Sequence, residues 1–233
     1  MKTIKTLGLF SLLILSIGTT SCNADEPIPP KKEPTIDEYG IAIDQEVDLG
    51  LPSGTIWAGW NLGATAPEEF GDYYACGETE TKAEYSLSNY SHWFDKNEDG
   101  YLTANPVYCE FIDIGSNISG TKYDVARFKW KGKWRIPTYE EFKELISYCT
   151  WTWIYYKDSY GYKVTGLNGV SIFLPFAGYI SGTTFYPIRG RYWSSTINEI
   201  NRYGIELCFD FNNFFDLCQT SYRHGGCSIR PVK

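Results

Sequence analysis

The chain has 233 residues, of which 43% are hydrophobic and 17% aromatic, so it is long enough to bury the core of one globular domain. Its formal net charge is -7 at pH 7, and no run of basic residues interleaves with aromatic ones. Such a surface repels phosphate backbones, and we therefore expect no nucleic-acid partner.

Residues 1–21 are predicted to form a signal peptide. Their apolar run, residues 7–17, follows two lysines and is too short to span a bilayer. The next stretch, Thr-Thr-Ser-Cys at 19–22, resembles a bacterial lipobox, although Thr19 stands where leucine is usual. We expect Cys22 to be lipidated and to become the first residue of the mature protein, with ordinary cleavage nearby as the alternative.

Residues 22–38 are predicted to be the lipidated N-terminus and a proline-rich tether. The acidic stretch at 23–26 resembles an export signal that sends some outer-membrane lipoproteins to the cell exterior. Four prolines mixed with Lys and Glu then make a stiff, solvated spacer. We expect an outer-membrane lipoprotein, exposed at the cell surface, whose folded domain spans residues 39–233.

The first half of this domain is predicted to be β-rich, with a long surface insertion at 80–120 where hydrophobic periodicity is lost. The elements expected before the centre of the chain are strands at 41–49 and 55–60, a short helical turn at 67–70, a strand at 71–75 and a helical piece at 123–128.

The strongest local signal is a helix that begins after Thr138. Thr138 and Glu141 have the spacing of a capping box, in which each side chain accepts a hydrogen bond from the other residue's backbone N–H. Apolar residues then recur at helical spacing, at Phe142, Leu145, Ile146 and Cys149. We expect this stripe to pack on a β-sheet.

Strands and turns fill the rest of the chain. Hairpins are expected at 162–174 and 203–222, and a last strand at 227–232. The sequence therefore predicts an α+β fold, with two short helices packed on a twisted, mostly antiparallel sheet.

Residues 95–103 have the spacing of an EF-hand-like calcium loop. Gly100 holds the turn position, but Pro106 stands where a bidentate glutamate is expected. Either calcium binds here or the segment is a solvated acidic turn; no other cofactor is expected. The candidate ligands are Asp95, Asn97, Asp99, the Tyr101 carbonyl and Thr103.

Six cysteines remain beyond Cys22, an even number in an exported chain, and at least one disulfide is expected, with buried free thiols as the alternative. No zinc site is expected, because the chain has no Cys-x-x-Cys pair and two histidines only. The pairings considered are Cys208 with Cys218, Cys76 with Cys109 and Cys149 with Cys227.

The length of the turn decides which residues pair across the hairpin at 203–222. With a three-residue turn, in which the numbers of paired residues add up to 426, Cys208 would lie beside Cys218 and Asp210 opposite Asp216. A two-residue turn would put the cysteines on opposite faces. Opposed carboxylates would need a cation, an arginine, a ligand or simply water to offset their repulsion.

Aromatic and polar residues near this hairpin suit sugar recognition, because rings stack on C–H faces while polar groups bond hydroxyls. Most rings should nevertheless be core; Tyr186, beside Pro187, is expected on a loop. The candidate ligand-binding residues are Tyr186, Arg189, Arg191, Asp210, Asn212, Asn213 and Asp216.

Seven ordered motifs between residues 43 and 232 resemble the Fibrobacter succinogenes major paralogous domain. The resemblance implies a C-type-lectin-like fold, and it indicates the fold more firmly than a function. The motifs are VDLGLPSGT at 47–55, NLGA at 61–64, GDY at 71–73, TKYD at 121–124, WRIPT at 134–138, YWSST at 192–196 and SIRPV at 228–232.

We expect a non-catalytic recognition module that binds a glycan or a protein through its loops. The first alternative is a structural or accessory subunit of a surface assembly, such as a fimbrial tip or an uptake complex. An enzyme is less expected. Residues 135–138 also resemble a motif of formylglycine-generating enzymes, for which Cys218 and Cys227 are the candidate cysteines, but the Gly-Asn-Val-Trp-Glu-Trp stretch of those enzymes is missing. The sequence leaves the oligomeric state open.

Overall fold

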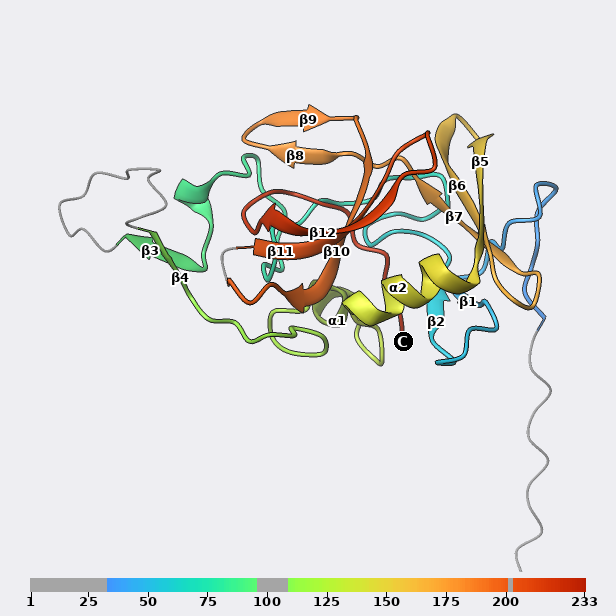
Figure 1. Ribbon diagram of the computed structural model, residues 1–233, viewed down its shortest axis with the longest axis horizontal. Coiled ribbons are helices and arrows are strands. Elements are labelled where there is room, and N and C mark those ends of the chain that lie inside the picture. Colours follow the sequence, from blue (N-terminus) through green and yellow to red (C-terminus); the bar gives the residue numbers. More distant parts are fainter. Residues whose placement is uncertain (1–32, 96–108, 201–202) are drawn as a thin grey trace, which may run out of the picture. The chain divides into compact units, whose positions relative to one another are not determined.

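The computed structural model describes residues 33–95, 109–200 and 203–233, and in them two α-helices accompany antiparallel strand pairs, which confirms the predicted α+β class (Figure 1). The helices are α1 (Val125–Trp130) and α2 (Tyr139–Tyr148), with a short 3-10 helix η1 (Leu87–Asn89). The strands are β1 (Glu46–Asp48), β2 (Ile56–Ala58), β3 (Trp93–Asp95), β4 (Cys109–Phe111), β5 (Thr150–Tyr156), β6 (Ser159–Thr165), β7 (Ser171–Pro175), β8 (Tyr179–Ser181), β9 (Thr184–Tyr186), β10 (Gly190–Ile197), β11 (Tyr203–Phe209) and β12 (Phe215–Tyr222).

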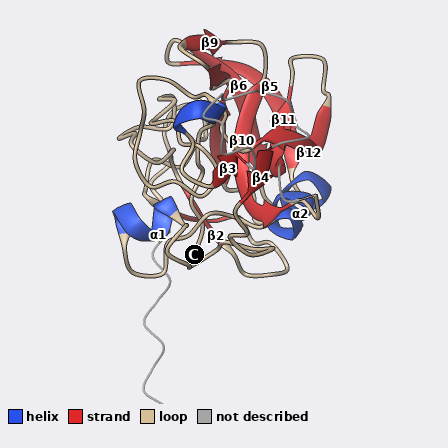
Figure 2. Ribbon diagram, turned by 90° about the vertical axis from the view of Figure 1, so that its left-hand side faces the viewer, coloured by secondary structure: helices blue, strands red, loops and turns tan. Residues whose placement is uncertain are grey.

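The strands form several small sheets in place of the one sheet that was predicted. Two sheets have three strands each, in the orders β5-β6-β7 and β10-β11-β12. Three two-stranded pairs, β1-β2, β3-β4 and β8-β9, complete the set within the described residues. Figure 2 shows the strands gathered on one side of the domain, with long loops on the other.

Helix α2 has the predicted boundaries and cap. Thr138 Oγ1 accepts a hydrogen bond from the backbone N–H of Glu141 at 3.2 Å, and Glu141 Oε2 accepts one from the N–H of Thr138 at 2.8 Å, which confirms the capping box. The same carboxylate binds Arg135 Nη1 at 2.7 Å. Burial alone would raise the pKa of Glu141, but the hydrogen bonds from Arg135 and Thr138 lower it below its usual value.

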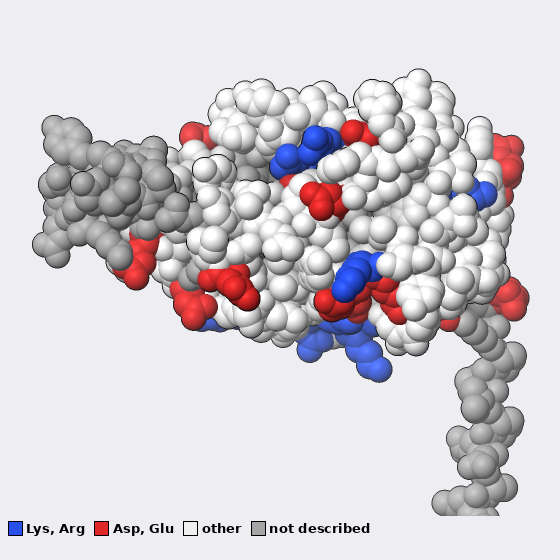
Figure 3. Space-filling view, viewed as in Figure 1, with Lys and Arg blue, Asp and Glu red and all other residues white. Residues whose placement is uncertain are grey.

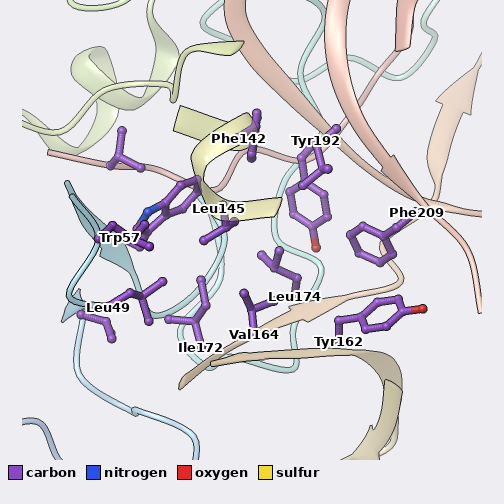
Figure 4. Close-up of a cluster of buried hydrophobic side chains, with 14 of the residues drawn as sticks. Leu49, Trp57, Phe142, Leu145, Tyr162, Val164, Ile172, Leu174, Tyr192 and Phe209 are labelled. Carbon is purple, nitrogen blue, oxygen red and sulfur yellow. The ribbon is translucent and has the colours of Figure 1, made fainter. Parts of the chain in front are cut away.

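The apolar stripe of α2 lies on the β10-β11-β12 sheet, as predicted. Phe142 and Leu145 are fully buried in a cluster that also includes Trp57, Tyr192 and Phe209, so it joins β2, α2, β10 and β11 (Figure 4). Ring stacking and edge contacts add to area burial here; the Trp57 and Phe142 rings lie 5.7 Å apart.

Three predicted elements of the domain were wrong. Residues 67–70 form turns, where the Glu69 carboxylate accepts a hydrogen bond from the N–H of Thr65 at 2.6 Å. The segment 71–75 makes a single bridge, from Tyr74 to Cys227, because Gly71 has φ +70° and cannot continue an extended strand. The segment 227–232 likewise makes isolated bridges to four separate partners.

The C-terminal segment of the domain pairs with β2, one of its first strands. Val232 bridges Trp57 of β2 and Arg135, and the N–H of Ile56 donates to the carbonyl of Lys233 at 3.0 Å. The C-terminal segment is therefore a structural part of the core. No helix in the described ranges combines the length and the apolar character needed to cross a membrane.

Candidate ligand-binding cleft

The β10-β11-β12 sheet has two chemically different faces. Side chains alternate across a strand, so residues two apart share a face. Leu207, Phe209 and Leu217 point into the apolar cluster under α2. The opposite face carries Arg191, Glu206 and Cys208, together with Cys218 and Asp216 of β12.

Neither of the two turns considered from the sequence gives the observed residue pairing of the 203–222 hairpin. Phe209 pairs with Phe215 and Cys208 with Asp216, so the partners sum to 424 and Asp210 does not face Asp216. The turn still has three residues, 211–213, but it sits one position earlier. Asn213 supplies the left-handed conformation that the turn requires, with φ +60°, and the Asp210 carboxylate accepts a hydrogen bond from the N–H of Asn212 at 2.7 Å.

A cleft of about 390 Å³ opens on this polar face. Its walls come from β8, β10, β11 and β12 and from residues 223–227, which bring together segments far apart in the chain. The residues that characterise it are Tyr179, Arg189, Arg191, Glu206, Tyr222 and His224.

One wall of the cleft is a ladder of stacked groups. The Tyr186 ring lies 4.9 Å from the Tyr179 ring at an interplanar angle of 14°. Next in the ladder, the Arg191 guanidinium lies 4.2 Å from the Tyr179 ring centre, and Arg191 Nη1 binds Glu206 Oε1 at 2.7 Å. Burial alone would lower the pKa of Arg191, but the Glu206 carboxylate raises it, so this arginine stays charged.

The other wall carries Tyr222 and His224, whose rings stack 5.3 Å apart at 21°. Burial lowers the pKa of His224, so its ring is neutral at pH 7. Two buried polar atoms of the cleft residues, Arg191 Nε and His224 Nδ1, have no hydrogen-bond partner within the described part of the chain. Such groups are costly to bury without a partner.

The predicted ligand residues divide into two groups. Arg189 and Arg191 line the cleft, and Tyr186 supports it through Tyr179, although Tyr186 ends strand β9 and does not lie on a loop. In contrast, Asp210, Asn212 and Asn213 hold the hairpin turn, where Asn213 Oδ1 also accepts from Tyr162 Oη at 3.1 Å. The remaining candidate, Asp216, accepts from Cys218 Sγ at 3.6 Å.

Sequence reasoning did not identify Tyr179, Tyr222, Glu206 and His224 as cleft residues. Glu206 is fully buried, and nothing in the local sequence indicates that burial. The cleft forms only when residues of β8, β10 and β12 come together in the tertiary structure, and local sequence does not indicate that arrangement.

The described cysteines are free thiols, so the structure contains neither a Cys208–Cys218 nor a Cys149–Cys227 bridge. Cys149 packs against the cluster under α2, whereas Cys227 belongs to a different buried cluster. Burial raises the pKa of Cys76 and of Cys149 to about 12, which keeps both protonated. The side chains of Asp95 and Cys109 lie outside the described part, as does the rest of the candidate calcium loop, residues 96–103.

Charged side chains are sparse on the face seen in Figure 3, where basic and acidic groups lie close together and not in a field of one sign.

Models of known protein families, curated proteins and solved structures were compared with the chain, and none of them matches it.

Proposed function

We propose that this protein is a cell-surface lipoprotein whose domain recognises a glycan in the cleft of the β10-β11-β12 sheet, without catalysing a reaction. The observation that supports the proposal best is the juxtaposition of two stacked aromatic walls with unpartnered polar atoms, Arg191 Nε and His224 Nδ1. The exposed ring of Tyr222 suits the C–H face of a sugar, and the polar side chains that line the cleft suit its hydroxyls.

The proposal includes a C-type-lectin-like fold within the family of the Fibrobacter succinogenes major paralogous domain. Two short helices, antiparallel strands and a long segment of loops are compatible with it. The contact of Val232 with Trp57, which joins the two ends of the domain, supports it further.

Replacing Tyr222 or Arg189 with alanine is expected to weaken glycan binding by about fivefold or more, because truncation of an anchor in a binding cleft costs over about 1 kcal/mol. A glycan array probed with the purified protein would identify the ligand, and titration of that glycan would then measure Kd for each variant. Tyr222 is 57% exposed, so its truncation should leave the fold intact.

Tyr160 provides a matched control, since it is also 57% exposed but lies on β6, in the other three-stranded sheet. Tyr160→Ala should bind like the wild type. A silent array would contradict glycan recognition and favour the structural-subunit alternative. Unchanged affinity in both cleft variants would show that the glycan binds elsewhere.

Membrane attachment depends on the lipid that Cys22 is proposed to carry. A single acyl chain binds weakly, so stable anchoring needs the full set of chains that lipoprotein processing attaches at this cysteine. Cys22→Ala is therefore expected to move the protein from the membrane fraction to the soluble fraction, measured by sedimentation and immunoblotting. If the variant sediments with membranes like the wild type, the lipid anchor is not at Cys22.

A further inference from the structure

The floor of the cleft holds a cluster of sulfur and oxygen donors. One carboxylate oxygen of Glu206 and the Sγ atoms of Cys208 and Cys218 all lie within 4.8 Å of one another. Cys208 Sγ is 3.1 Å from Glu206 Oε1, and Cys227 Sγ is 3.2 Å from Glu206 Oε2. Glu206 and Cys208 are completely buried, whereas Cys218 is half-buried and lines the cleft.

The strand register favours a shared ligand over a disulfide between the two thiols. Cys208 pairs with Asp216 and Cys218 pairs with Glu206, so the cysteines are diagonal neighbours on one face. Cα atoms of diagonal neighbours are about 7–8 Å apart, whereas a disulfide usually needs about 4.4–6.8 Å. Two cysteines whose Cα atoms are this far apart can instead bind one ion, because two thiolate sulfur atoms on tetrahedral zinc lie about 3.8 Å apart.

Charge and donor type define the ion. Thiolates select zinc and other thiophilic metals, whereas calcium and magnesium prefer oxygen ligands. With Cys208 and Cys218 deprotonated, the two thiolates and the Glu206 carboxylate carry three negative charges. A divalent ion and the Arg191 guanidinium, which binds the same carboxylate at 2.7 Å, balance them.

We propose that Glu206, Cys208 and Cys218 bind a thiophilic divalent metal ion, with zinc the best match to the donors, at the floor of the cleft. Binding releases the two thiol protons to solvent and forms two metal–sulfur bonds and one metal–oxygen bond. Three protein ligands leave a fourth position, and the cleft lies on that side because Glu206 and Cys218 line it. The proposal does not depend on glycan recognition.

Cobalt(II) is the probe for this site, because it occupies zinc sites and its thiolate complexes absorb visible and near-ultraviolet light. The full chain, reduced and held without oxygen, should bind one equivalent of cobalt with thiolate charge-transfer and tetrahedral ligand-field bands, and zinc should displace it. Cys218→Ser and Cys208→Ser should each weaken binding by more than about 100-fold, since losing a ligand costs more than losing an outer-shell partner. Cys149→Ser is the matched control and should bind like the wild type.

The wild-type titration can overturn the proposal without any variant, and the variants show where the ion binds. Absence of charge-transfer bands in the reduced wild type would overturn the proposal. Bands that persist in both Cys208→Ser and Cys218→Ser would also overturn it, because the ion would then sit elsewhere. Cys218→Ser changes a half-buried side chain, and its circular dichroism spectrum should match that of the wild type.

Discussion

Replacing Arg230 with methionine is expected to lower the free energy of unfolding by about 3 kcal/mol or more, because it leaves three buried acceptors without a donor and each such group costs about 1–3 kcal/mol. Arg230 is fully buried, and its guanidinium donates two hydrogen bonds to the segment 58–61 and one to β7, both distant from Arg230 in the chain. The acceptors are Asn61 Oδ1 at 2.8 Å, the carbonyl of Ala58 at 3.1 Å and the carbonyl of Phe173 at 2.8 Å. Methionine would fill the volume but leave these acceptors unsatisfied.

The cation itself is costly to bury, since burial lowers the pKa of Arg230 to about 10. The native structure tolerates it because the fork of donors joins β2, β7 and the C-terminal segment. Arg230→Lys should therefore also destabilise the domain, since lysine keeps the charge but cannot reach three acceptors with the same geometry.

Urea unfolding followed by tryptophan fluorescence measures these changes. Arg127→Met is the matched control, because Arg127 is exposed on α1. The free energy of unfolding of this variant should stay within about 0.5 kcal/mol of the wild-type value. An Arg230→Met variant within 1 kcal/mol of the wild type would show that the network contributes little.

Local signals were sufficient to predict α2. The capping box involves residues only three apart, and the apolar stripe follows from the helical period. Both features can therefore be recognised in the sequence without knowledge of tertiary contacts. The hairpin of β6 and β7 was predicted for the same reason, from Gly-containing turn residues between two apolar runs.

Prediction failed where a turn uses unusual residues. Strands β5 and β6 are joined by Lys157 and Asp158, both with positive φ, a conformation that Asn-Gly would have signalled and Lys-Asp does not. In the 203–222 hairpin, Asn212 and Asn213 both suit the left-handed position, and the choice of Asn213 sets the register. A side-chain period of two keeps the cysteines on one face even though their partners changed.

The cleft itself could not be predicted, because none of its walls is continuous in sequence. The ion pair of Arg191 with Glu206 requires the β10-β11 ladder, and β10 was not predicted as a strand. The sulfur cluster is similar: no Cys-x-x-Cys spacing signals it, since its thiols meet across a hairpin.

Arg191→Met is expected to lower the free energy of unfolding by about 3 kcal/mol or more, because it would leave the Glu206 carboxylate buried without its cation. Glu206 is 0% exposed, and its remaining partners are the thiols of Cys208 and Cys227, which are weak donors. Glu206→Met should also destabilise the domain, since it would leave the guanidinium of Arg191, 21% exposed, without its carboxylate.

The double variant Arg191→Met/Glu206→Met should be more stable than the sum of the two single effects predicts, by about 2 kcal/mol or more, because no unpaired charge is then buried and methionine fits irregular space. Urea unfolding of all four proteins with a metal chelator present would measure this coupling, because the chelator removes any stabilisation by a bound ion. Additive losses would show that the two charges are screened from each other and that the short contact between them does not stabilise the sheet. A large coupling would show that the two charges stabilise each other within the sheet. A double variant more stable than the wild type would show, in addition, that the charged pair costs stability relative to an apolar floor, as expected of a sheet face kept polar for binding.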